Sequence, residues 1–501
     1  MENRIMLRPG ICDVDNRHYL PEELTDGKTT VNENGNNSQV YPERLKEYKE
    51  VLVDGIEDTW YEYVPESYNP EKKTPLVLSM HGGLMNGWGQ AVYTSWTLVA
   101  DREGFIVVFP NAAKTRMWMM ECDWDRVIET IGQISGDVPL LHKPEKNVEE
   151  YHDVKKTLKI IEKMKQKYNI DAGRIYMQGM SMGNAMTSQF ARYEGKILAG
   201  AAGSGCPTNS KLLFDENDEV INKSGPLDIW QSRLELDKVP PHYREGDHGT
   251  IRRNVEYWNR VNECDSLPEI SIRDEYNFAF YHGNKGNNVL MDVKNRDHGQ
   301  TFDDAELVWD YLFSGCYKDE NGVLCHKKPE KEMHADEVNI AVSAGQRKAW
   351  INNKVIEMPQ SAFLWNKVKY HGLNGDVAVR GSFIYVSVRF ISEVFGMECH
   401  IKENGRVVEL EGTPKIGKLK TQKNYCIQFA EGNVASVVNN HIEAMYVEAV
   451  KKEDDLCVSL EWFVRRFLNL HISNCDGVFY ATDHSAQISW HMADLIKMYL
   501  D

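Results

Sequence analysis

The chain has 501 residues, of which 42% are hydrophobic and 27% charged, and its formal net charge at pH 7 is −17. No stretch reaches the roughly 18 to 20 consecutive apolar residues that a membrane-spanning helix needs, which excludes an integral helical membrane protein. An acidic chain also complements a nucleic-acid backbone poorly, so we expect neither a nucleic-acid nor a membrane partner. The length exceeds what one hydrophobic core usually supports, which predicts at least two domains.

The ten cysteines show no metal-binding or disulfide framework. They are spread from Cys12 to Cys475 without a CxxC pair, unlike those of a zinc cluster or a small disulfide-rich fold. The N-terminal sequence MENRIMLRPGICDVDNRHYL lacks the apolar core of a signal peptide. We therefore expect a cytoplasmic chain, or a secreted one if a leader has been removed.

Residues 1–48 are polar and rich in Asn, Asp and Glu, which indicates an N-terminal extension. After them, short apolar runs alternate with amphipathic helical patterns, as in βαβ units that build a mostly parallel sheet. The runs expected to form strands are 76–80, 105–110, 174–179, 197–202, 226–231, 278–283 and 289–293. The stretches expected to form helices are 148–168, 181–194, 249–261 and 303–313.

A hydrophilic stretch at 317–336 indicates a domain boundary. We expect an α/β domain over 49–325 and a smaller domain over 336–501.

The smaller domain contains an internal repeat. VSVRFISEVFGMECHI (386–401) matches VSLEWFVRRFLNLHIS (458–473), and INNKVIEM (351–358) matches VNNHIEAM (438–445). Each copy reads as strand, strand, short amphipathic helix and hairpin. The pattern predicts a C-terminal α+β domain made of two related repeats.

The strongest chemical signal is the pentapeptide Gly179-Met180-Ser181-Met182-Gly183. A strand-like run leads into it and a small-residue helical pattern leads out, which is the context that a GxSxG nucleophile elbow requires. Ser181 would stand at a tight turn with its hydroxyl exposed.

A serine nucleophile needs a base and an acid that orients the base. In this architecture the acid and then the histidine follow the serine along the chain. Asp237 and Glu235 both follow the strand-like run 226–231, and Asp237 is favoured because it comes after the full turn. Two Asp-His-Gly tripeptides compete for the base. His298 is favoured over His248 because only His298 follows a strand.

The negative charge that develops on an attacked carbonyl needs backbone N–H donors. We expect one donor from Met182, the residue after the nucleophile. The other is expected from Gly83 in the His81-Gly82-Gly83 turn that follows the run 76–80, with Leu84 as the neighbouring alternative.

The Met- and Trp-rich segment 117–125 and Trp230 are candidates for the substrate pocket. Trp118 and Trp230 could line an apolar or aromatic acyl pocket, although packing in the core explains them equally well. The sequence has no HExxH, P-loop or GxGxxG motif, so no metal, nucleotide or other cofactor is expected.

These motifs resemble the poly(3-hydroxybutyrate) depolymerase and feruloyl esterase group of α/β-hydrolases over roughly residues 50–315. The resemblance is carried by LVLSMHGG (76–83), ADREGFIVVFPNA (100–112), RIYMQGMSMGNAM (174–186) and RDHG (296–299). It implies a serine esterase without a cofactor, with Ser181, Asp237 and His298 as its triad. The implied substrates are feruloyl or acetyl esters of plant polysaccharides, or polyester chains.

The chain departs from the usual pattern of this group at three places. Arg233 and Leu234 stand where a His-Gly pair commonly precedes the acid loop, and Met182 stands where Asn is frequent. The histidine of the group commonly precedes an aromatic-Pro pair, whereas Gly299-Gln300-Thr301 follow His298 here. The Met182 amide can still donate to an oxyanion, but the pocket wall is more apolar, so substrate selection is expected to differ.

YVSVRFISEVFG (385–396) resembles the N-terminal-like stalk domain of copper amine oxidases. Despite that name, the resemblance implies an accessory domain rather than a copper site. Binding of a polymer or formation of a homodimer are the expected roles of this domain. Other hydrolases of the same fold, namely polyhydroxyalkanoate or oligoester depolymerases, serine peptidases and thioesterases, remain open, as does a binding protein with a vestigial hydrolase fold.

Overall fold

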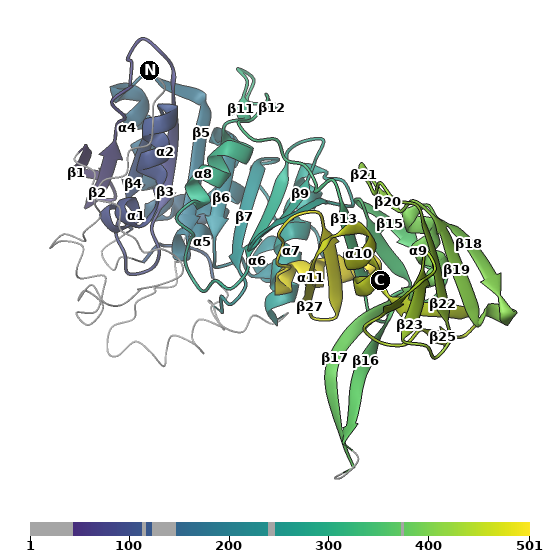
Figure 1. Ribbon diagram of the computed structural model, residues 1–501. Helices are drawn as coiled ribbons and strands as arrows, with labels where there is room; N and C mark the ends of the chain where they lie inside the picture. The colour runs from purple at the N-terminus through teal and green to yellow at the C-terminus, as the bar shows by residue number, and fades with distance from the viewer. Residues whose placement is uncertain (1–43, 113–116, 123–146, 239–245, 372–374) are drawn as a thin grey trace, which may run out of the picture. The chain divides into compact units, whose positions relative to one another are not determined.

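The computed structural model describes residues 44–112, 117–122, 147–238, 246–371 and 375–501 (Figure 1). The predicted extension 1–48 lies almost wholly outside this part of the chain. Contacts within the chain define two compact units, and each is described by itself. The first comprises Met1–Ser266 and Phe280–Met333, and the second comprises Leu267–Ala279 and His334–Asp501.

The first unit is built on a mixed β-sheet in which eight strands follow one another in the order β1-β2-β4-β3-β5-β6-β7-β10. These strands are β1 (Leu45–Val53), β2 (Ile56–Tyr63), β3 (Thr74–Met80), β4 (Ile106–Pro110), β5 (Ile170–Met180), β6 (Gly200–Ser204), β7 (Asp228–Leu234) and β10 (Asn288–Val293). From β4 to β10 all neighbours are parallel, whereas β1 and β2 add an antiparallel edge. The parallel strands β3, β4 and β6 are buried along their whole length, as expected for a sheet covered on both faces.

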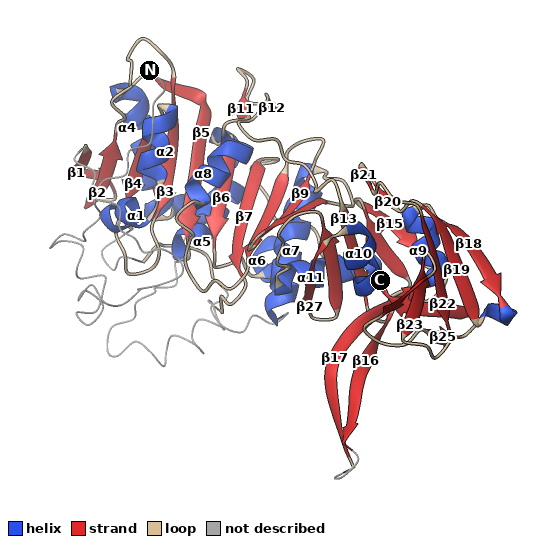
Figure 2. Ribbon diagram, in the orientation of Figure 1, coloured by secondary structure: helices blue, strands red, loops and turns tan. Residues whose placement is uncertain are grey.

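Helices flank this sheet (Figure 2). They are α1 (Gly87–Tyr93), α2 (Trp96–Glu103), α4 (His152–Lys167), α5 (Met182–Tyr193), α6 (Ser210–Leu213), α7 (Gly246–Asn262) and α8 (Asp304–Val308), the last continuing as a π-helical turn, Trp309–Phe313. Because the carboxyl ends of parallel strands meet at one edge of a sheet, the loops after β3, β5, β7 and β10 converge there. The β1–β2 hairpin and the helices α1 and α2 are not among the elements predicted from the sequence. The strand expected at 197–202 begins only at Gly200, because residues 195–197 form a 3-10 turn.

The second unit is rich in antiparallel strands. One sheet has the order β15-β14-β13-β28-β27, a second β16-β17-β26-β25 and a third β18-β19-β22-β23-β24. The strands are β13 (Asn339–Ser343), β14 (Lys348–Ile351), β15 (Lys354–Glu357), β16 (Phe363–His371), β17 (Asp376–Ser387), β18 (Glu398–Lys402), β19 (Val407–Gly412), β22 (Tyr425–Ala430), β23 (Ala435–Val438), β24 (His441–Ala444), β25 (Val450–Lys452), β26 (Asp455–Ser459), β27 (His471–Cys475) and β28 (Val478–Thr482), with a small ribbon of β20 (Lys415–Ile416) and β21 (Leu419–Lys420). Its helices are α9 (Val388–Phe395), α10 (Leu460–Leu468) and α11 (Trp490–Leu500).

The two segments matched in the sequence have the same order of elements. In both, a strand leads into a short helix and then into a hairpin, as β17-α9-β18-β19 and β26-α10-β27-β28. A serine caps each helix: the Ser387 hydroxyl accepts the Arg389 N–H at 3.1 Å, and the Ser459 hydroxyl accepts the Trp462 N–H at 3.2 Å.

Most of one hairpin from the middle of the chain, Leu267–Ala279, groups with the second unit. It comprises β8 (Glu269–Arg273) and the first residues of β9 (Tyr276–Tyr281), whose last two residues group with the first unit. The buried carboxylate of Asp336 binds the β8 strand. Asp336 accepts the Ser271 hydroxyl at 2.7 Å, the Ile272 N–H at 2.8 Å and the Tyr480 hydroxyl at 2.8 Å. These hydrogen bonds are the physical reason that residues 267–279 group with the C-terminal residues, a grouping that the sequence does not predict.

None of the helices in the described ranges is both long and apolar enough to cross a membrane.

Candidate active site

Ser181 stands at the sharp turn between β5 and α5. Its φ of 56° and ψ of −121° lie outside the ordinary regions for a residue with a side chain, a strain that is typical of a nucleophile elbow. The turn is tight because a Cβ atom on Gly179 would lie 2.0 Å from the Gly183 carbonyl oxygen. The Ser181 N–H donates to the Ser204 carbonyl on β6 at 2.8 Å, which fixes the corner against the sheet.

His298 and Asp237 lie beside this serine, in the order that the sequence predicts. The Nε2 atom of His298 is 2.8 Å from the Ser181 Oγ atom, and its Nδ1 atom is 3.0 Å from Oδ1 of Asp237. Asp237 follows β7 and His298 follows β10. The Asp237 side chain is 7% exposed and that of His298 is 26% exposed. A carboxylate, an imidazole and a hydroxyl therefore form a hydrogen-bonded line, with the partly exposed histidine in the middle and the serine hydroxyl at one end.

Glu235, the alternative acid, has a different place. Its carboxylate accepts the Asn295 N–H at 2.9 Å and the Lys294 ammonium at 3.3 Å. These contacts tie the end of β7 to the loop after β10. His248, the alternative base, lies in the first turn of α7, and its side chain is outside the described part of the structure.

Two residues that the sequence analysis missed support the Asp237–His298 pair. Gly205 has a φ of +65°, and a Cβ atom on it would lie 3.1 Å from Oδ2 of Asp237 and 3.3 Å from Cε1 of His298. The Asn184 amide in the first turn of α5 donates to the Gly205 carbonyl at 2.5 Å and to the Cys206 carbonyl at 3.2 Å. The run Gly203-Ser204-Gly205 at the end of β6 was the available sequence signal.

The loop after His298 is anchored by buried polar contacts. The Ser204 hydroxyl donates to the Gly299 carbonyl at 2.7 Å, and the Gln178 amide donates to the Gln300 side chain at 2.9 Å. The Gln300 N–H donates to the Tyr93 hydroxyl at 3.2 Å. These contacts position His298 from three elements, β5, β6 and α1.

The two predicted oxyanion donors lie on neighbouring segments. A Cβ atom on Gly83 would lie 2.8 Å from the Met182 Sδ atom and 3.3 Å from the Met117 Sδ atom. Met182 is the first residue of α5, where amide groups and the helix dipole favour negative charge. The Gly83 loop thus approaches the helix N-terminus that begins beside Ser181, with methionine side chains around it.

His81 anchors the loop that carries Gly83. It is fully buried, its Nε2 atom accepts the Ala112 N–H at 2.9 Å, and its Nδ1 atom is 2.6 Å from the Gly82 carbonyl oxygen. The acceptor role of Nε2 assigns the proton to Nδ1, which donates to Gly82. The Trp118 indole N–H donates to the His81 carbonyl at 2.7 Å.

Trp118 and Trp230, predicted as pocket-lining residues, both lie inside the fold. Each is 1% exposed. Trp118 packs against the His81 ring, with centroids 4.7 Å apart, and the Trp230 indole donates to the Ser232 hydroxyl at 2.9 Å. The Trp118 indole supports the loop that carries Gly83, whereas the contact of the Trp230 indole lies within β7. Part of the segment 117–125, namely 123–125, lies outside the described residues.

Among the residues that the structure describes, no group of three or more His, Cys, Asp and Glu side chains could hold a metal ion.

Over 263 residues the chain is 25% identical to the bifunctional acetylxylan esterase/xylanase of Neocallimastix patriciarum, an alignment that covers 50% of this chain and 32% of that protein. It is also similar to the structures of a thermostable esterase (22% identity, TM-score 0.31, 45% of this chain and 55% of that one) and of the acetyl xylan esterase from Aspergillus awamori (14% identity, TM-score 0.37, 53% and 97%). The chain thus spans about a third of the length of the curated relative. No protein-family model matches it.

Proposed function

We propose that the first unit is a serine carboxylesterase that hydrolyses carboxylic esters through an acyl-enzyme. The observation that carries the proposal is the hydrogen-bonded line from Asp237 through His298 to Ser181, with separations of 3.0 Å and 2.8 Å. The sequence similarity to an acetylxylan esterase supports it.

In the proposed reaction, His298 Nε2 takes the proton of Ser181 as the hydroxyl oxygen attacks the ester carbonyl carbon. Asp237 holds the imidazole in place and stabilises its protonated form. The backbone N–H groups of Gly83 and Met182 bind the oxyanion of the tetrahedral intermediate. His298 then gives its proton to the leaving alcohol, and water releases the acyl group by the same steps.

We propose acetyl esters of a plant polysaccharide as the first substrates to test, with feruloyl esters second. The relative's name includes acetylxylan, and the methionines 117 and 182 beside Gly83 offer an apolar surface for a small acyl group. The aromatic side chains that would have favoured a feruloyl group, Trp118 and Trp230, are buried.

Hydrolysis of p-nitrophenyl acetate by the wild type, Ser181→Ala and Ser188→Ala tests the proposal. Ser188 lies on the same helix and bonds the Thr208 hydroxyl at 2.8 Å, so it is a matched control. We expect Ser181→Ala to lower kcat at least about 10³-fold and Ser188→Ala to lower it less than about twofold. Equal activity of all three proteins would contradict the role of Ser181. A panel of acetylated xylan, methyl ferulate, an oligomeric 3-hydroxybutyrate ester, a peptide anilide and a thioester then identifies the acyl class.

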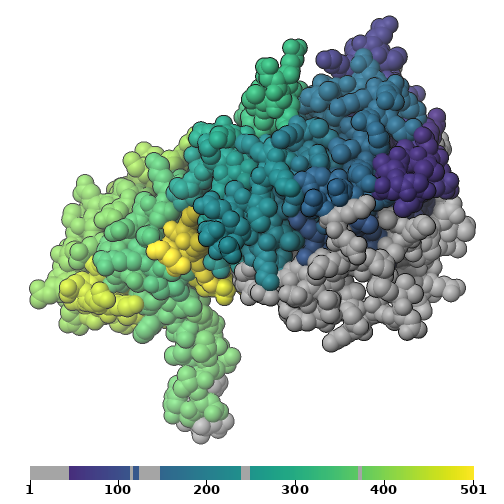
Figure 3. Space-filling view, turned by 180° about the vertical axis from the view of Figure 1, so that it is seen from behind, coloured from purple at the N-terminus to yellow at the C-terminus, as the bar shows by residue number. Residues whose placement is uncertain are grey.

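We propose that the second unit has an accessory role and binds a second copy of this chain. Only the end of β17 pairs with β26, and the rest of the β16–β17 hairpin projects from this unit (Figure 3). Val368 pairs with Val379 and Tyr370 with Val377, and these four side chains are 57 to 64% exposed. Such an apolar face favours burial against another surface. Sedimentation of the wild type and of Val377→Lys tests this: a dimer that the substitution dissociates is expected, and a monomeric wild type would contradict it.

A further inference from the structure

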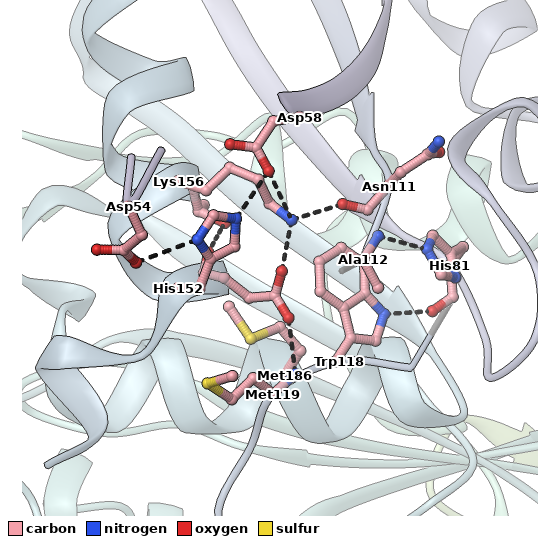
Figure 4. A network of polar contacts seen from close by, with 12 residues as sticks. Asp54, Asp58, His81, Asn111, Ala112, Trp118, Met119, His152, Lys156 and Met186 are labelled. Carbon is pink, nitrogen blue, oxygen red and sulfur yellow. Dashed lines mark hydrogen bonds and ion pairs between the residues drawn. The ribbon is translucent and has the colours of Figure 1, made fainter. Parts of the chain in front are cut away.

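A cluster of charged side chains is buried between the start of α4 and the loop that carries Gly83 (Figure 4). Asp153 and Lys156 on α4 are both 0% exposed, Asp58 on β2 is 4% exposed and His152 is 5% exposed. Burying an ammonium or a carboxylate is costly unless each charge is paired and hydrogen-bonded. The hydrogen bonds that satisfy these buried charges therefore fix the positions of the backbone segments that supply them.

The Lys156 ammonium has partners on three segments. It forms an ion pair with Oδ1 of Asp153, donates to the Asn111 carbonyl at 2.6 Å and lies 3.9 Å from Oδ1 of Asp58. It also stands 5.4 Å from the centre of the Trp118 ring, within the range of a cation–π contact. Asn111 directly follows β4, so Lys156 joins α4 to that strand end.

The second oxygen of Asp153 holds another segment. Oδ2 accepts the Met119 N–H at 2.7 Å, while Oδ1 is occupied by Lys156. One buried ion pair thus fixes two stretches of backbone, at residue 111 and at residue 119.

Both stretches hold His81 directly. Ala112, next to Asn111, donates its N–H to the His81 ring at 2.9 Å, and Trp118, next to Met119, donates its indole N–H to the His81 carbonyl at 2.7 Å. His81 in turn contacts the Gly82 carbonyl at 2.6 Å. The chain of contacts from the ion pair ends one residue from Gly83.

We propose that Lys156 and Asp153 are positioning residues that set the backbone of the loop 81–83, and through it the oxyanion donor at Gly83. The inference rests on the proposed function for its catalytic consequence. Oxyanion donors act only within a narrow range of distance, so a displacement of about 1 Å lowers the rate strongly. Breaking the pair is therefore expected to reduce kcat while leaving substrate binding nearly unchanged.

The variant Lys156→Met, which is similar in length and uncharged, tests the proposal against Lys167→Met. Lys167 lies on the same helix and pairs with Glu62 on the same strand as Asp58, at 2.7 Å, but its contacts do not lead to His81. For p-nitrophenyl acetate we expect Lys156→Met to lower kcat by roughly 10- to 100-fold with KM changed less than about threefold. Lys167→Met is expected to change neither by more than about twofold.

Amide hydrogen exchange provides a readout that needs no turnover. The Ala112 and Met119 amides are expected to exchange at least about tenfold faster in Lys156→Met than in the wild type, and at the wild-type rate in Lys167→Met. The variant Asp153→Asn keeps an acceptor oxygen for Met119 but removes the charge that pairs with Lys156. If Lys156→Met does not fold, faster exchange at the Ala112 amide of Asp153→Asn, with most of the protection at Met119 retained, supports the positioning role, and wild-type exchange at both amides overturns it.

The outcomes separate the two proposals. Unchanged exchange in Lys156→Met, or equal loss of kcat in both lysine variants, would overturn the positioning role. If the wild type hydrolyses no ester and Ser181→Ala behaves identically, the proposed function fails, and the exchange rates still decide whether the ion pair holds the loop.

Discussion

The carbonyl oxygen of Met80 lies 2.1 Å from the position that a Cβ atom on Gly183 would occupy. The His81 carbonyl oxygen lies 2.7 Å from the same position. The end of β3 therefore packs directly against the first turn of α5, and this approach is what places the Gly83 loop beside Met182. The second glycine of the GxSxG motif serves this packing as well as the turn.

Gly183→Ala is expected to destabilise the first unit severely. A methyl group cannot fit between backbone atoms of two elements without separating them, and we expect a loss of about 3 kcal/mol in the free energy of unfolding. Urea unfolding followed by tryptophan fluorescence measures it. A wild-type midpoint would mean that β3 and α5 are not in contact as described.

Gly205→Ala is expected to lower kcat through Asp237 and His298. Its added methyl group would press on both side chains, at 3.1 Å and 3.3 Å. Gly225→Ala is the matched control, because Gly225 also has a positive φ, +91°, but no atom lies within 4 Å of its Cβ position. In both variants an alanine must adopt a positive φ, which costs about 1 kcal/mol. We expect roughly tenfold lower kcat only in Gly205→Ala; equal values would show that Gly205 does not position the pair.

Asp237→Asn and Glu235→Gln distinguish the two candidate acids. An amide at 237 cannot stabilise the protonated imidazole, so kcat is expected to fall by about 10³- to 10⁴-fold. Glu235→Gln weakens only the contacts to Asn295 and Lys294, and a change of less than about tenfold is expected. Steady-state kinetics with p-nitrophenyl acetate gives both values, and the reverse ranking would assign the acid to Glu235.

Asp304 makes stability dependent on pH. Its buried carboxyl accepts the Ser232 hydroxyl, and burial raises the pKa of Asp304 from 3.8 to about 7. The folded state therefore binds a proton between about pH 4 and pH 7 that the unfolded state has lost, so this group's contribution falls as the pH rises through that window. Asp304→Asn is expected to raise the free energy of unfolding at pH 8 by on the order of 2–4 kcal/mol. It is also expected to make the free energy of unfolding fall less steeply between about pH 4 and pH 7. Parallel curves of stability against pH would contradict this.

His152 makes the stability of the protein depend on pH above about pH 6.5. The hydrogen bond between Nε2 and Asp58, 2.8 Å long, raises the pKa of His152 above 6.5. The bond between Nδ1 and Asp54, 3.1 Å long, raises this pKa further, whereas the nearby positive charge of Lys156 lowers it. A raised folded-state pKa contributes stability that is complete below about pH 6.5 and is lost as the pH rises through the folded value. Compared with His152→Gln, the wild type is expected to be more stable at pH 6, with a smaller difference at pH 9. A difference independent of pH, measured by urea unfolding, would mean that the imidazole stays neutral.

The chain order of Ser181, Asp237 and His298 could be predicted because each follows a strand of a parallel sheet, and the ends of such strands meet at one edge. The turn residues Gly179, Gly183 and Gly83 follow from local backbone geometry in the same way. Strand and helix positions around them were predictable because burial imposes periodicity on the sequence.

Only the tertiary structure decided which acid faces His298, because Asp237 and Glu235 are separated by a single residue and the local pattern suits both. Burial of Trp118 and Trp230, the support from Gly205 and Asn184, and the Lys156–Asp153 pair likewise join residues far apart in the chain. The hairpin 267–279 grouped with the C-terminal unit through Asp336, which no local signal marks. Such contacts depend on how separate elements pack in space, and a single sequence records the periodicity of each element but not the distances between them.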